Sequence, residues 1–160
     1  MALHKLLVDD FYDSYYVLLA IHCRLEDYRL AYLLNKHLDI RLMRKPQDLD
    51  YKYFAASFSI YEWDNEDMDT KWNLVSNVCK KDEAALQSSG SLFSNQNIIT
   101  KTYNLLPEFK NVDYFIKVTN DNQKFNEKLT VSRIQSIPQV ITTYSVDIDQ
   151  IKSKDHLIFN

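Results

Sequence analysis

The stretch VDYFIKVTNDNQKFNEKLTVSRIQSIPQVITTYSV, residues 112–146, decides the fold, because two strand patterns flank one helix pattern. Residues 112–118 and 140–146 are rich in β-branched and aromatic side chains, which favour strands. Between them, an Asn-Asp-Asn run supplies residues that cap helix N-termini, and Pro138 ends the helical pattern. The region is therefore predicted to form a strand, a helix over about residues 123–136 and a second strand.

The N-terminal part of the chain shows the same order of patterns. Residues 15–21 form a short apolar run that is typical of a strand buried on both faces. Over residues 25–38, apolar side chains recur every three or four positions, with acidic residues in the first turn and basic residues in the last, which predicts a helix. Residues 40–44 alternate between apolar and basic side chains before Pro46, which predicts a half-exposed strand.

The middle of the chain completes the predicted fold. Residues 57–63 and 72–78 alternate in polarity on either side of an acidic turn, which predicts a hairpin. The order strand–helix–strand, hairpin, strand–helix–strand predicts a ferredoxin-like α+β sandwich, with a mainly antiparallel sheet and two helices on one face. Residues 1–160 are expected to form a single domain. Residues 80–98 lack periodicity and contain the only glycine, Gly90, so a flexible surface excursion is expected there.

Composition excludes several classes of protein. A single glycine in 160 residues leaves no Walker loop, no dinucleotide-binding glycine motif and no Gly-x-Ser-x-Gly elbow. A net charge of −3 gives no basic footprint for duplex DNA. The N-terminus lacks a signal-peptide pattern, and the longest apolar run is too short to span a bilayer. Cys23 and Cys79 are expected to be free thiols, with a disulfide as the alternative, so the sequence predicts a cytoplasmic protein without membrane contact.

One motif resembles a known family. Residues 106–114 read LPEFKNVDY, which resembles the signature of the IPExxxVDY family of bacterial proteins, with Leu106 in place of isoleucine. The stretches LEDYRLAYLLN at 25–35 and KTYNL at 101–105 are also similar to that family. The resemblance implies a small bacterial cytoplasmic protein, and it implies no particular activity because the family is uncharacterised.

A second resemblance covers residues 112–152. Their strand, helix, Ile137-Pro138 turn and second strand are similar to the effector domain of leucine-responsive feast/famine regulators, an ACT-like or RAM-like domain. Those domains dimerise through their sheets and hold small ligands at the interface, which implies the same here. Gln139 departs from the glycine that usually follows the proline in that family, and no helix-turn-helix pattern precedes the domain.

The motif residues themselves allow two interpretations. The residues concerned are Pro107, Glu108, Val112, Asp113 and Tyr114. The two carboxylates could form an acid–base pair. Alternatively, the proline opens a short turn, Glu108 caps it, and Asp113 binds backbone at the start of a strand, which is the favoured interpretation.

Metal binding is not predicted. His22 and Cys23 are adjacent, so on a strand their side chains point to opposite faces, and no third ligand follows at helical spacing. Catalysis needs polar groups that converge on one pocket, and the chain offers only separated carboxylates and this single pair. We therefore expect no catalytic residue and no cofactor.

Basic residues interleaved with aromatic ones define a candidate site for RNA or another anion. The residues are Arg41, Arg44, Lys45 and Lys52. Lysine and arginine can bind phosphates while neighbouring aromatic rings stack on bases. Aspartates lie among these residues and weaken the positive field, so an ordinary solvated edge is the alternative.

Aromatic residues on the strands suggest an interface. We expect Tyr61, Trp63 and Tyr144 on the sheet face that carries no helices, where an exposed aromatic patch would favour a dimer. The alternative is that the segment 80–98 and the C-terminal Leu-Ile-Phe cover that face within one chain. The sequence thus predicts a non-enzymatic binding or scaffold module that acts through a homodimer or a protein partner. An RNA-associated accessory protein and a small-ligand ACT-like sensor are the alternatives.

Overall fold

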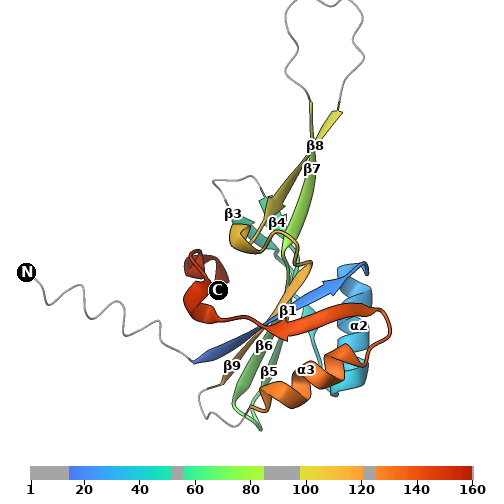
Figure 1. Cartoon of the computed structure of the whole chain (residues 1–160), viewed down its shortest axis with the longest axis vertical. Helices are drawn as coiled ribbons and strands as arrows, with labels where there is room; N and C mark the ends of the chain where they lie inside the picture. The colour runs from blue at the N-terminus through green and yellow to red at the C-terminus, as the bar shows by residue number, and fades with distance from the viewer. Residues whose placement is uncertain (1–14, 52–55, 85–97, 121–124, 160) are drawn as a thin grey trace, which may run out of the picture.

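The computed structural model describes residues 15–51, 56–84, 98–120 and 125–159 (Figure 1). Its centre is a six-stranded sheet of order β10-β1-β9-β6-β5-β2, in which all neighbouring strands are antiparallel. The strands are β1 (Tyr16–Cys23), β2 (Met43–Arg44), β5 (Ile60–Asn65), β6 (Thr70–Ser76), β9 (Tyr114–Asn120) and β10 (Val140–Ser145). The α-helices in these described ranges are α2 (Asp27–Leu38) and α3 (Glu127–Gln135).

Two smaller sheets and three short helices complete the described part of the chain. One sheet pairs β3 (Leu49–Tyr51) with β4 (Ala56–Phe58), and the other pairs β7 (Val78–Ala84) with β8 (Ile98–Asn104). The 3₁₀ helices are η1 (Pro107–Phe109), η2 (Ile148–Gln150) and η3 (Lys154–Leu157). No helix in these described ranges is long and apolar enough to cross a membrane.

The predicted α+β class, the mainly antiparallel sheet and the two helices are confirmed. The predicted hairpin is the β5–β6 pair. The sheet is larger and richer in strands than the predicted ferredoxin-like sandwich, because β2 and β5 extend one edge and a further strand pair, β7–β8, lies between β6 and β9 in the chain.

Both helices pack on one face of the six-stranded sheet (Figure 1). Leu30 and Leu34 of α2 and Ile134 of α3 are fully buried against alternate residues of the central strands. Among these strand residues are Leu19, Ile21, Leu74, Ile116 and Val118. Burying such side chains contributes roughly 1.5–3 kcal/mol each, so this face is the main source of cohesion between helices and sheet.

The opposite face of the sheet is covered from within the chain. Leu18 and Phe115 point to that face and pack in a second apolar core together with Leu106, Ile151 and Leu157. These last three come from the segment around η1 and from the C-terminal turns. The C-terminal part of the alternative cover is therefore observed, since Leu157 is buried in this core and Phe159 packs against it. Its other part is not, because residues 80–84 belong to β7 and residues 85–97 lie outside the described residues.

This arrangement corrects the predicted aromatic interface. Tyr61 is buried in the helix-side core, and Trp63 packs against the same core. The reason is strand parity, because Ile60 points to the second core and its neighbour must point to the helices. Tyr144 is 40% exposed, and its hydroxyl lies 3.1 Å from Nε2 of His22. The three residues therefore do not form one exposed patch.

Two predicted segments differ in structure. Residues 80–84 were predicted to lie in an irregular excursion, but they belong to β7. Their regular structure comes from pairing with β8, which the local sequence pattern does not show. Residues 85–97 lie outside the described residues. The predicted strand at 40–44 shrinks to the two residues of β2. Its earlier part is held by Asn35 of α2, whose side chain bonds both the N–H and the carbonyl of Leu42 at 2.8 and 3.1 Å.

Candidate functional site

The motif segment, residues 105–114, runs from the end of β8 through η1 into β9. Pro107 occupies the start of η1, where a missing backbone N–H costs no intrahelical hydrogen bond. Leu105, Leu106 and Val112 are buried in the second core. The segment therefore lies across the sheet face opposite to the helices and closes one side of that core.

A buried asparagine organises the motif segment. The side-chain amide of Asn77 donates hydrogen bonds to the carbonyls of Phe109 and Val112, each at 2.8 Å. Its side-chain oxygen accepts from the N–H of Leu106 at 2.9 Å. Its backbone N–H donates to the carbonyl of Asp113 at 2.9 Å. Sequence reasoning missed Asn77, because one asparagine near the end of a predicted strand carries no signature until the segment beside it is placed.

Glu108 joins η1 to the C-terminal turns. Its Oε1 accepts hydrogen bonds from the backbone N–H groups of Lys152 and Ser153 at 2.7 and 2.8 Å, and its Oε2 accepts from the Ser153 hydroxyl at 3.2 Å. Partial burial acts to raise the pKa of this carboxyl, but the donated hydrogen bonds outweigh it and hold the pKa below its usual value. Glu108 is therefore an ionised anchor for the C-terminal segment.

Asp113 and Tyr114 bind a different part of the chain. Oδ2 of Asp113 accepts a hydrogen bond from the backbone N–H of Cys23 at 3.0 Å, and the Tyr114 hydroxyl donates to the carbonyl of Leu25 at 2.7 Å. Burial, together with neighbouring negative charge, raises the pKa of the Tyr114 phenol. Glu108 and Asp113 thus bind backbone at two separate places, which favours a structural role over the acid–base pair. The predicted capping role of Glu108 is wrong, because η1 has no side-chain cap and Glu108 binds the C-terminal turns instead.

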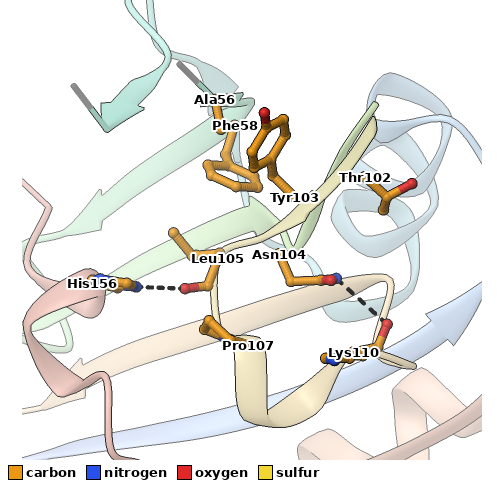
Figure 2. A pocket seen from close by; sticks show the side chains of 9 residues that line it. All are labelled: Ala56, Phe58, Thr102, Tyr103, Asn104, Leu105, Pro107, Lys110 and His156. Atoms are coloured by element: carbon orange, nitrogen blue, oxygen red, sulfur yellow. Dashed lines mark hydrogen bonds between the residues drawn. The ribbon is translucent and has the colours of Figure 1, made fainter. Parts of the chain in front are cut away.

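A cavity of about 200 Å³, the η1 cavity, lies beside the motif segment (Figure 2). Ala56, Phe58, Leu105 and Pro107 provide its apolar walls. His156 of η3 closes one side, with Nδ1 2.7 Å from the carbonyl of Leu105. Because a carbonyl can only accept a hydrogen bond, Nδ1 carries the proton in this contact.

The β7–β8 ribbon, residues 78–84 and 98–104, borders the same cavity and extends away from the body of the molecule (Figure 1). Its strands pair with each other and with no other strand in the described residues. Cross-strand contacts hold it together: the Thr100 hydroxyl donates to Asp82 at 2.6 Å, and Glu83 forms an ion pair with Lys101. Ile98 and Ile99 are 65% and 51% exposed.

The predicted basic residues do not form an open cationic surface. Arg44 forms an ion pair with Asp48, lies 4.0 Å from a carboxylate oxygen of Asp27, and stacks over the Tyr61 ring. Lys45 Nζ lies 3.4 Å from Glu62. These contacts neutralise much of the charge that a phosphate would need.

The other two predicted basic residues are Arg41 and Lys52. Arg41 borders a surface hollow whose other charged lining residues are acidic, Asp39, Asp64, Glu66 and Asp67. Lys52 lies outside the described residues. The basic residues that the structure describes are therefore interleaved with carboxylates, as the alternative interpretation of a solvated edge requires.

The described cysteines and histidines do not form a reactive or metal-binding cluster. Cys23 and Cys79 are both free, and burial raises the pKa of the Cys23 thiol, which makes it a poor nucleophile. His22 contacts Tyr144 instead of a metal-binding partner. Among the residues that the structure describes, no group of three or more histidine, cysteine or acidic side chains could hold a metal ion.

Lys117 is a partly buried cation that the sequence did not single out. Its Nζ donates to the carbonyl of Leu157 at 2.8 Å and lies 4.8 and 5.2 Å from the ring centres of Tyr16 and Phe159. Burial, reinforced by the charge of Lys71, lowers the pKa of this amine. The arrangement fixes the C-terminal segment on the sheet.

Comparisons with known proteins add no assignment. Searches against protein-family models, curated proteins and solved structures found no match to this chain.

Proposed function

We propose that this protein is a non-enzymatic binding module that holds a protein partner through the β7–β8 ribbon. The observation that supports this proposal is the ribbon itself, a two-stranded sheet with no further strand beside it in the described residues and with two exposed isoleucines, Ile98 and Ile99. An isolated two-stranded ribbon is at best marginally stable in water. Exposed strand edges and exposed apolar side chains are features that pair with another chain.

The proposal of a non-enzymatic role draws support from how the polar groups are used. The polar side chains of the motif form hydrogen bonds with backbone groups of distant segments; they are Glu108, Asp113 and Tyr114. A catalytic carboxylate would instead face a substrate-sized pocket with a second polar group within reach. The motif therefore supports a binding scaffold better than a reaction centre.

The alternatives differ in their support. RNA binding is weakened by the carboxylates that pair with Arg44 and Lys45. A small-ligand sensor draws support from the η1 cavity, although this cavity lies between segments of one chain, whereas the ligands of ACT-like domains lie at a dimer interface. Self-association is the closest rival, since a second copy could use the same ribbon. Light scattering on the purified protein tests self-association, because a dimer has twice the mass of the 19.0 kDa chain.

The finer identity of the fold belongs to the same proposal. Strands β10, β1, β9 and β6 are adjacent in that order and share the face covered by α2 and α3. We infer a ferredoxin-like unit that has gained β2 and β5 at one edge and the ribbon between β6 and β9. Membership of the IPExxxVDY family and a cytoplasmic location are proposed on the sequence motif alone.

Affinity capture from cells that produce the protein tests the proposed function. A tagged wild-type chain should retain a protein partner after nuclease treatment, and the double variant I98S/I99S should lose it. The matched control is I141S/I158S, which removes two isoleucines that are also exposed but lie on β10 and near the C-terminus. Loss of the partner on nuclease treatment would favour RNA, and equal capture by both double variants would exclude the ribbon as the contact.

A further inference from the structure

The outer edge of β8 offers backbone hydrogen-bonding groups at alternate residues. The N–H of Leu105 donates to the carbonyl of Asn77 at 2.9 Å, which sets the phase of the β7–β8 pairing. In an antiparallel pair, residues alternate between pointing their N–H and C=O groups toward the partner strand and away from it. Thr100, Thr102 and Asn104 therefore direct these groups away from β7.

The outer edge of β7 is partly closed, which distinguishes the two edges. At its start, the N–H and the carbonyl of Val78 both bond the Ser76 hydroxyl, at 3.3 and 2.9 Å. Strand β4 also packs near β7. Strand β8 is consequently the edge of the ribbon that is offered to another chain.

The η1 cavity is bordered by β8. Four consecutive residues, 102–105, line it, and Phe58 and Pro107 face it from the other sides (Figure 2). Its volume of about 200 Å³ is below the roughly 300–1,000 Å³ of pockets that hold drug-sized ligands. The cavity is therefore suited to one apolar side chain.

We propose that β8 and the η1 cavity together bind an extended peptide segment of the protein partner, which pairs with β8 as an added strand and inserts one apolar side chain into the cavity. This inference rests on the proposed function and specifies its partner. Strand addition uses main-chain hydrogen bonds for affinity and side-chain pockets for specificity, and both elements occur here in one place.

Charge further defines the peptide. Lys110 lines the cavity, and no carboxylate is among the described residues that line it. The His156 imidazole, which also lines the cavity, lies 3.9 Å from a carboxylate oxygen of Asp155, so the positive charge of the cavity comes from Lys110. The Lys110 ammonium forms no ion pair with the described part of the chain. The partner segment is therefore an apolar anchor, aromatic or branched aliphatic, with an acidic residue next to it.

A displayed library of random short peptides, selected on the intact chain, is the test. Selected sequences should share an apolar anchor beside an acidic residue. The variant T102P removes an outward N–H without removing a β7–β8 hydrogen bond. It should lower the affinity for a synthetic copy of the selected peptide about tenfold. The matched variant T102V keeps that N–H and should bind as wild type does. A56L, which fills the cavity from its wall, should weaken binding by a similar factor.

Amide hydrogen exchange gives a second readout that does not depend on these variants. When the selected peptide binds, the amides of Thr100 and Thr102 should become protected, while those of Lys101 and Tyr103 are protected with or without peptide. Protection of neither edge amide, or equal binding by T102P and wild type, would overturn strand addition. Protection that rises with protein concentration alone would show that the edge pairs with a second copy instead.

The outcomes also separate this inference from the proposed function. If the partner captured from cells is lost by I98S/I99S but retained by T102P and A56L, the ribbon binds a protein in some other way and the inference fails alone. If no protein partner is captured and the library yields no peptide, both fail.

Discussion

The carboxylate of Asp113 accepts a hydrogen bond from the backbone N–H of Cys23, although the two residues lie 90 positions apart in the sequence. The pairing of β1 with β10 shifts register between His22 and Cys23, so this N–H lies where the strand ladder is irregular. The next residue, Tyr114, binds the carbonyl of Leu25 just before α2. The last part of the motif thus fixes where β1 ends and where α2 begins.

Replacing Asp113 tests this role. D113A leaves the Cys23 N–H without its acceptor, so the free energy of unfolding should fall by about 1–3 kcal/mol. D113N retains an acceptor oxygen and should lose less. Urea denaturation followed by tryptophan fluorescence measures both. An equal loss in the two variants would mean that the charge, and not the hydrogen bond, matters.

Asn77 should be the most sensitive polar residue of the motif region. N77A removes three side-chain hydrogen bonds from a fully buried position. The Leu106 N–H and the Val112 carbonyl lose this partner, whereas the Phe109 carbonyl still accepts from the N–H of Val112 at 3.1 Å. The expected loss in the free energy of unfolding is roughly 2–4 kcal/mol. N104A is the control, because that side chain is half-buried and makes longer bonds of 3.3 and 3.4 Å; its loss should stay below about 1 kcal/mol.

The fold could be predicted where local pattern and tertiary environment agree. Helix α2 and strands β1, β9 and β10 show their periodicity in the sequence because each buries a regular set of apolar side chains. The β7–β8 ribbon could not be predicted, since residues 78–83 include no buried residue and their order comes from pairing with β8. The strand at 40–44 was overestimated because Asn35, on another element, takes the backbone groups of Leu42.

The candidate sites were harder to predict than the fold. Aromatic alternation placed Tyr61 and Trp63 on one face, but it could not say which face receives the helices. The η1 cavity depends on β4, β8 and the C-terminal His156, which come together only in the tertiary structure. No pattern within one segment can reveal a site built in this way.

The C-terminal cover of the sheet should contribute to stability as core residues do. Leu157 is 1% exposed within the second core, whereas its neighbour Ile158 is 42% exposed. L157A should therefore reduce the free energy of unfolding by about 2–5 kcal/mol, and I158A should change it by less than about 0.5 kcal/mol. Thermal unfolding followed by circular dichroism compares the two. Similar, small effects would mean that the C-terminal turns detach without cost.

Acid should weaken the contact between Glu108 and the C-terminal turns. The pKa of this carboxyl is lowered in the folded protein, because the hydrogen bonds from Ser153 and Lys152 outweigh the effect of burial. Its contribution is thus present above the ordinary glutamate pKa of about 4.3 and is lost as the pH falls through the folded-state value. E108Q should lose less stability than wild type between about pH 6 and about pH 3, and S153A should be intermediate. Parallel urea midpoints for E108Q and wild type at both pH values would contradict this role.

Lys117 should make the protein more stable at alkaline pH relative to a variant without the amine. Burial lowers the folded-state pKa of Lys117, so between that value and the ordinary lysine pKa of about 10.4 the unfolded chain binds more protons than the folded one. The free energy of unfolding therefore rises with pH across this window. Buried tyrosines such as Tyr114 act in the opposite direction, since their pKa values are raised. The quantity to measure is consequently the difference in the free energy of unfolding between wild type and K117M, in which the tyrosine contribution cancels. Urea denaturation at steps from about pH 7 to about pH 10 should show this difference shifting in favour of wild type, and a constant difference would mean that the Lys117 ammonium is solvated in the folded protein.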